Sequence, residues 1–122
     1  MARVECLIGK ILICVARVNE DGEDAIYFTT SDGKRYKMYH AQDCCEHVSI
    51  EDITGDLLDL VGEPILIAEE VTSKSEEDGE DELQESFTWT FYKFATRKGY
   101  VDIRWYGTSN GYYSEEVDLV EI

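Results

Sequence analysis

Basic residues are scarce in this sequence, and no segment of it is suited to crossing a membrane. Eleven lysines and arginines stand against 27 aspartates and glutamates, which gives the 122 residues a formal net charge of −16. Nucleic-acid backbones and anionic lipids are bound by basic surfaces, so we expect no direct binding to either. A partner with a basic surface is favoured instead, because opposite charges attract over long distances at low salt.

The most apolar run, LIGKILICVA at residues 7–16, is too short to span a bilayer and is interrupted by Lys10. No small-residue cleavage site follows it, which argues against a secretory signal. The sequence therefore predicts a cytoplasmic protein. In that compartment its four cysteines are expected to be reduced thiols.

Motifs of several enzyme classes are missing as well. The sequence has no glycine-rich phosphate loop, no Cys-x-x-Cys and no paired zinc motif. Neighbouring carboxylates are frequent, but in so acidic a chain they do not distinguish a catalytic pair from a solvated surface. We therefore expect a protein that is not an enzyme and that needs no cofactor.

Most of the sequence is typical of β-strands, because β-branched and aromatic runs alternate with turn residues. The length suits a single domain over residues 1–122. Asp32-Gly33 predicts a two-residue hairpin turn of type I′, and Asp56, Gly62 and Pro64 predict one short helix near residues 56–61. Candidate strands lie at residues 6–18, 25–30, 34–40, 48–53, 65–72, 87–96, 100–106 and 112–120.

The expected fold is mainly β, a curved antiparallel sheet or small barrel of six or seven strands with that one helix. Alternation predicts which side chains face the core in two of the strands. These are Tyr36, Met38 and His40 in one strand, and Val101, Ile103 and Trp105 in the other. The face opposite the second set carries Asp102, Arg104 and Tyr106.

The segment at residues 69–85 is the most acidic part of the chain. It contains nine carboxylates and one base, Lys74, and so carries half of the net charge. Mutual repulsion and low hydrophobicity predict a mobile acidic loop at about residues 72–86. The loop is either a solvated hairpin connection or a functional mimic of a phosphate chain.

The stretch YHAQDCCEHV at residues 39–48 is a candidate chemical site. Its potential zinc ligands are His40, Cys44, Cys45 and His47. Adjacent cysteines on a strand point to opposite faces, so this spacing is poor for one metal ion. A cysteine nucleophile paired with a histidine, oriented by Asp43 or Glu46, is a second hypothesis, and a bend braced by Asp43 is the simplest. Cys6 and Cys14 are expected to be small buried residues.

The second candidate site is the stretch RWYGTSNGYYSEEV at residues 104–117. It surrounds a turn with more aromatic residues than a turn requires. Exposed tyrosine, tryptophan and arginine often anchor interfaces, and they can also stack on a small ligand. The candidate residues are Arg104, Trp105, Tyr106, Asn110, Tyr112 and Tyr113.

With these segments in view, the chain resembles a family of small phage- and prophage-encoded domains of unknown function. The resemblance covers nearly the whole length, and its signatures are QDCCE at residues 42–46, TWTFYK at 88–93 and RWYGTSNGYYSE at 104–115. It implies a phage origin and a setting in the host cytoplasm. The family brings no activity with it.

Three function classes follow from these observations. The first is a non-enzymatic inhibitor or modulator of a host protein with a basic surface, for example a counter-defence protein of the anti-CRISPR or anti-restriction kind that mimics DNA. The second is a module that binds a small ligand or nucleotide between the 40–47 bend and the 104–113 aromatics. The third is a zinc- or cysteine-dependent enzyme.

Overall fold

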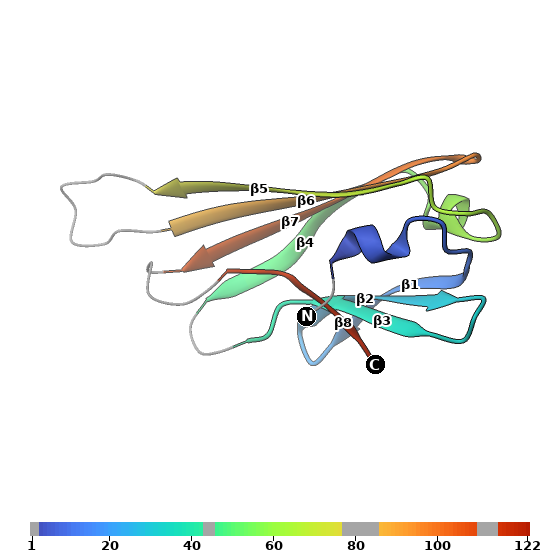
Figure 1. Cartoon of the computed structure of the whole chain (residues 1–122). Coiled ribbons are helices and arrows are strands. Elements are labelled where there is room, and N and C mark those ends of the chain that lie inside the picture. Colours follow the sequence, from blue (N-terminus) through green and yellow to red (C-terminus); the bar gives the residue numbers. More distant parts are fainter. Residues whose placement is uncertain (1–2, 43–45, 77–85, 110–114) are drawn as a thin grey trace.

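The computed structural model of the chain describes residues 3–42, 46–76, 86–109 and 115–122. These residues form two four-stranded antiparallel sheets that lie over one another as two layers (Figure 1). Sheet I has the order β1-β2-β3-β8 and consists of β1 (Leu12–Glu20), β2 (Glu23–Thr30), β3 (Arg35–Tyr39) and β8 (Asp118–Glu121). Sheet II has the order β4-β7-β6-β5 and consists of β4 (His47–Thr54), β7 (Gly99–Ser109), β6 (Ser86–Thr96) and β5 (Ile67–Glu76).

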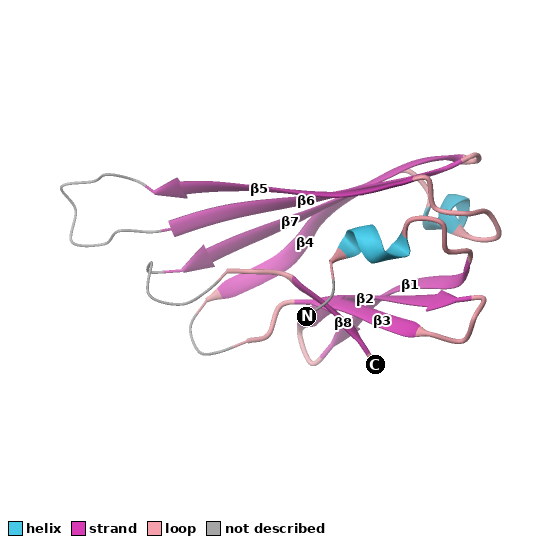
Figure 2. Cartoon of the chain, in the orientation of Figure 1, coloured by secondary structure: helices cyan, strands magenta, loops and turns pink. Residues whose placement is uncertain are grey.

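The prediction of a mainly β fold is confirmed, as the predominance of strands in Figure 2 shows. The number and grouping of the strands differ from the expectation. The described residues form eight strands in two sheets, and these sheets do not close into a barrel. Side-chain alternation identifies the inward face of a strand but not the strands that share its sheet. The sequence therefore did not show how the strands divide between two sheets, because the chain changes sheets after β3 and again after β7.

The helical elements are two short 3-10 turns, η1 (Val4–Leu7) and η2 (Leu57–Leu60). The second occupies the place of the predicted short helix, and the Asp56 carboxylate caps it by accepting from the Leu58 N–H at 2.9 Å. In the described part of the chain, no helix is long and apolar enough to cross a membrane. Residues 72–76, which the sequence assigned to the acidic loop, continue β5, and Ser86 already belongs to β6. The rest of that predicted loop lies outside the described residues.

The type I′ turn lies at a different Asp-Gly pair from the one predicted. Asp21 and Gly22 both have positive φ, 52° and 84°, and they join β1 to β2 in a two-residue turn. At Asp32-Gly33 only Gly33 has positive φ. There the Gly33 N–H donates to the Thr30 carbonyl and the Thr30 N–H donates to the Lys34 carbonyl, so the loop has three residues. The prediction of a type I′ turn at Asp32-Gly33 is therefore wrong.

The core fills the space between the two sheets. Phe28 of β2 and Phe94 of β6 meet across it with their ring centroids 5.6 Å apart. The segment η1 closes one side, where Val4 and Leu7 are buried (Figure 1). The predicted inward sets on β3 and β7 are confirmed, because all six of their side chains are buried.

Cys6 and Cys14 were expected to be buried, but both are exposed. In η1 the turn directs Val4 and Leu7 inward and leaves Cys6 outside. In β1 a register shift between Leu12 and Cys14 reverses the alternation, so Val15 rather than Cys14 faces the core.

Two glycines of similar conformation differ in what surrounds them. Gly55 and Gly62 both have positive φ, 99° and 89°. A Cβ on Gly55 would lie 2.4 Å from the Tyr100 carbonyl oxygen, whereas a Cβ on Gly62 would meet nothing within 4 Å. Gly55 is thus needed both for its backbone conformation and for the close approach of the strand β7.

We predict that Gly55→Ala destabilises the fold more than Gly62→Ala. The second substitution adds only the strain of a left-handed alanine, about 1–2 kcal/mol. The first adds a clash with backbone that has no free rotamer to relieve it. The free energies of unfolding of the two variants, measured by urea denaturation, provide the comparison. Equal losses would show that the contact with Tyr100 is not tight.

Candidate functional site

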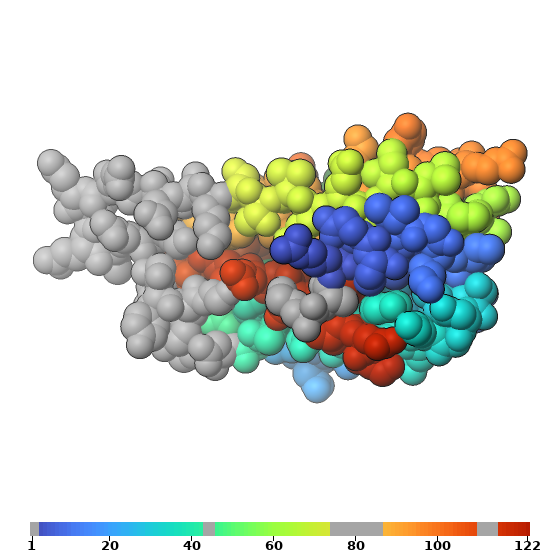
Figure 3. Space-filling model, viewed as in Figure 1, coloured from blue at the N-terminus to red at the C-terminus, as the bar shows by residue number. Residues whose placement is uncertain are grey.

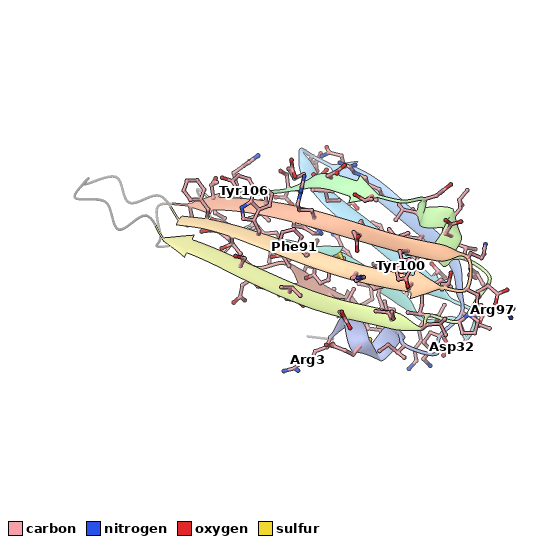
Figure 4. The ribbon with its side chains drawn as sticks, turned by 90° about the horizontal axis from the view of Figure 1, so that it is seen from above. Arg3, Asp32, Phe91, Arg97, Tyr100 and Tyr106 are labelled. Carbon is pink, nitrogen blue, oxygen red and sulfur yellow. The ribbon has the colours of Figure 1, made fainter. Side chains whose placement is uncertain are left out.

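The outer face of sheet II, which points away from sheet I, carries an aromatic cluster. Alternation along β6 directs Phe87, Trp89 and Phe91 outward, and Tyr106 of β7 lies beside them. We call these four residues the aromatic face. Figure 4 looks onto this side of the sheet, with Phe91 and Tyr106 on neighbouring strands.

The aromatic rings contact one another through the pairing of β6 with β7. Trp89 and Tyr106 are direct cross-strand partners with ring centroids 4.4 Å apart. Phe87 stacks on Tyr106 at 6.1 Å, and Phe91 stacks on Trp89 at 6.3 Å. Such pairs stabilise a sheet beyond the area they bury. The rings therefore form one ordered surface.

A β-bulge in β4 places two carboxylates beside Arg104. Ile50 pairs with Trp105 and Asp52 pairs with Arg104, so Glu51 is an extra residue on β4. The Glu51 carboxylate accepts from Arg104 Nε, and Asp52 Oδ2 lies 4.0 Å from Arg104 Nη2. These ion pairs are solvent-exposed, so each contributes at most about 1 kcal/mol. Their effect is to hold the guanidinium over Trp89, with its carbon 5.4 Å from the ring centroid.

Next to the aromatic face the sheet is hollowed. The hollow has a volume of about 500 Å³ and draws its lining from all four strands of sheet II. Within it a charged row crosses three strands, because Lys93 pairs with Glu69 on one side and with Asp102 on the other. The lining residues are Asp52, Thr54, Glu69, Val71, Phe91, Lys93, Asp102 and Arg104. Phe91 and Val71 give the lining an apolar part, and five of the other six lining residues are charged.

His40 and Glu46 form a buried pair away from this face. His40 Nδ1 lies 2.6 Å from the Glu116 carbonyl oxygen, and His40 Nε2 lies 2.9 Å from Glu46 Oε1. A carbonyl oxygen only accepts, so Nδ1 carries a proton, and a second proton lies between Nε2 and the carboxylate. Both ring nitrogens are thus engaged in protein contacts.

The two histidines of the zinc and nucleophile hypotheses lie in different surroundings. His47 is exposed at the start of β4, where its partner Thr108 belongs to the outer face of sheet II, while His40 is buried. Asp43, Cys44 and Cys45 lie outside the described residues. Among the residues that are described, no group of three or more histidines, cysteines or carboxylates is arranged to hold a metal ion.

Ser109 lies in a catalytic sequence motif that sequence reasoning missed. Residues 107–111 read Gly-x-Ser-x-Gly, the spacing of a hydrolase nucleophile turn. Ser109 ends β7, is buried, and donates to Glu115 Oε2 at 2.7 Å. A hydrolase turn needs an exposed serine between a strand and a helix, and the only helical elements in the described residues are η1 and η2. In the described structure, Ser109 makes a buried contact with Glu115 instead of presenting an exposed hydroxyl.

The structure divides the predicted site residues into separate groups. Arg104 and Tyr106 lie on the outer face of sheet II, as the alternation predicted. Trp105 is only 1% exposed, so it belongs to the core and cannot anchor a partner. His40 and Glu46 are brought together, but in the interior. Asn110, Tyr112 and Tyr113 lie outside the described residues.

Sequence reasoning missed the aromatic face's members on β6 and the pairing of the two bulge carboxylates with Arg104. The signal was present in FTWTFYKF at residues 87–94, where aromatic residues alternate with threonines. The sequence did not show that these aromatic side chains point outward, because strand alternation is symmetric between the two faces of a sheet.

The fold and this face together define a small two-sheet β domain with a partly exposed aromatic surface. The chain belongs to the family described as a domain of unknown function (DUF7448), whose model matches residues 5–119. No curated protein and no solved structure matches the chain.

We predict that the pair His40–Glu46 tolerates an amide but not truncation. In Glu46→Gln, the side-chain amide can donate to His40 Nε2, so the loss of stability should be small. Glu46→Ala leaves a buried imidazole without its partner and should cost about 3–5 kcal/mol. Thermal and urea unfolding of the two variants would measure the difference. Similar losses in both would show that the carboxylate charge itself is required.

Proposed function

We propose that this domain is a non-enzymatic binding module that recognises a protein with a basic surface through the outer face of sheet II. The observation that carries the proposal is the inverted pattern along β6. Thr88 and Thr90 point inward and are buried, whereas Phe87, Trp89 and Phe91 point outward. A half-solvated strand normally has its apolar residues inside. An ordered, partly exposed aromatic patch, in which Phe91 is exposed and Phe87 and Trp89 are half-buried, is a mark of an interaction surface.

The composition of the face agrees with a protein partner. Tryptophan, tyrosine and arginine are the residues that most often dominate binding energy at interfaces. Trp89, Tyr106 and Arg104 lie next to one another here, and Arg104 is held in place by the bulge carboxylates. A rigid anchor loses little conformational entropy on binding.

The charge around the face favours a basic partner. Glu51 and Asp52 lie beside Arg104, and Asp52, Glu69 and Asp102 line the hollow next to Phe91 together with the cations Arg104 and Lys93. The whole chain carries −16. A basic surface would be attracted at long range and then desolvated against the aromatic rings.

The narrower form of the proposal is a phage-encoded inhibitor of a host protein, such as a defence nuclease, in the host cytoplasm. The resemblance to phage domains and the acidic surface support it. Imitation of DNA would need carboxylates held at fixed spacing. On sheet II, Glu51 and Asp52 are partly neutralised by Arg104. We therefore assign the main role to aromatic docking, with the other carboxylates contributing attraction.

A small ligand is the second candidate, because the hollow of about 500 Å³ beside Phe91 is large enough for one. Its lining of three carboxylates, one ammonium group and one guanidinium group beside Phe91 and Val71 favours a polar molecule with an apolar part. A thermal-shift screen would detect such a ligand as a rise in the melting temperature.

We predict that Trp89→Ala weakens partner binding by about 30-fold or more, since truncation of a central interface aromatic costs about 2 kcal/mol or more. The measurement is capture of partners from host-cell extract followed by native mass spectrometry and titration of the captured protein. The matched control is Tyr27→Ala, because Tyr27 is a half-buried aromatic on β2 of sheet I. Equal losses in the two variants would contradict the proposal, and a bound small molecule lost in Phe91→Ala would favour the second candidate.

A further inference from the structure

The strand β5 has one free edge. It pairs with β6 over ten residues in an unbroken register, from Ile67 opposite Ala95 to Glu76 opposite Ser86. On its other side, no strand of the described chain pairs with it. Proteins protect such edges with proline, a bulge, a very short strand or charged side chains. The strand β5 has no proline or bulge and is ten residues long. Its charged residues between Ile67 and Ser73 are the acids Glu69 and Glu70, which repel another acidic chain but attract a basic one.

The N-terminal segment covers only part of this edge. In the space-filling view, η1 (dark blue) lies below the green part of β5, and the yellow end of the strand continues past it (Figure 3). Val71, Thr72 and Ser73 in this part of the strand are exposed. Their backbone groups on the free side are therefore accessible to an added strand.

The two sides of β5 next to the edge differ in chemistry. Val71 pairs with Phe91, so it points to the outer face and extends the aromatic face; it is 59% exposed. Glu70 pairs with the buried Tyr92, so it points to the inner side. An extended peptide along the edge would present alternate side chains to these two environments.

The inner side of the edge is crowded with carboxylates. Burial, together with the charges of Glu5 and Glu116, raises the pKa of Glu70, which Thr72 and Arg3 partly oppose. Burial and the Glu116 charge likewise raise the pKa of Asp118 on β8. Elements of both sheets and η1 thus contribute negative charge beside the edge. A cation brought there would be favoured.

We infer that the free edge of β5 binds an extended basic peptide segment of the partner as an added strand, with basic side chains facing Glu70 and apolar side chains facing Val71. This inference rests on the proposed function and specifies its partner chemistry. A second copy of the chain fits the edge poorly. Each copy carries −16, and an added β5 would bring Glu69 and Glu70 to a surface that is already acidic.

The test uses two fluorescent eight-residue peptides of equal composition, one alternating lysine with valine and one with the lysines and valines in separate blocks. Fluorescence anisotropy with the intact protein measures both affinities. We expect the alternating peptide to bind at least about tenfold more tightly, because only alternation sorts the side chains between the two sides of the edge. Equal affinities would overturn the inference, since net charge alone would then explain the binding.

Two proline variants locate the binding. Successive residues of a strand direct their N–H groups to opposite sides, so one of Val71 and Thr72 points to the free edge and the other to β6. Of Val71→Pro and Thr72→Pro, the variant that keeps the wild-type melting temperature is the one altered at the free edge. The affinity of this variant for the alternating peptide should fall by at least about tenfold. Arg97→Pro serves as the control, because Arg97 lies in the β6–β7 turn, between the paired Thr96 and Gly99. Unchanged binding would overturn the inference.

Two further outcomes separate this inference from the proposed function. A captured partner that depends on Trp89 but not on the edge proline would overturn the inference and leave the function standing. Peptide binding that depends on the edge, with capture unaffected by Trp89→Ala, would support the inference and contradict the role of the aromatic face.

A dimer abolished by the edge proline would assign the edge to a second copy and overturn the inference.

Discussion

The pairing of β6 with β7 is the constraint on which the other features depend. The two strands pair without interruption from Ser86 opposite Ser109 to Thr96 opposite Gly99. One side of this ladder supplies the largest core residues, among them Trp105, Tyr92 and Phe94. The other side supplies the aromatic face and Arg104. A slip of one residue would exchange the two sides, so the same register fixes both the stability of the core and the position of the candidate binding surface.

The flanking strands of sheet II adjust this surface in different ways. On one edge, the bulge in β4 brings Glu51 and Asp52 to Arg104, and Asp24 of sheet I accepts from the Ile50 N–H at 2.9 Å just before the bulge. That edge is therefore partly satisfied within the domain. On the other edge, β5 runs straight and its free side has no pairing strand among the described residues. The asymmetry directs any strand addition to the β5 side.

The sequence predicted the fold class and the inward faces because these depend on local alternation. Tyr36, Met38, Ile103 and Trp105 are buried as expected. Prediction from the sequence failed where a single residue changes the alternation of side chains between the two faces of a strand. The register shift after Leu12 exposed Cys14, and the extra residue Glu51 created the carboxylate pair at Arg104. Bulges have weak sequence signals, because the geometry arises from the partner strand. The division into two sheets was likewise inaccessible, since it depends on which strands meet after the chain crosses between layers.

The inverted pattern of β6 has two parts. The fold explains the direction in which its side chains point, but it does not require the outward side chains to be aromatic. On the inner side of this end of sheet II, Thr88 pairs with Gly107, and the buried Glu115 lies close to Gly107 and accepts from Ser109, which gives a polar cover there. Buried threonines at 88 and 90 suit such a polar cover, and alternation then sends residues 87, 89 and 91 outward. Alternation determines only their direction. Polar residues there would serve the fold equally well and would avoid an exposed apolar patch. Sites that break a local rule without a gain in packing are where function is expected, and here that site adjoins the free edge of β5 through Val71 and Phe91.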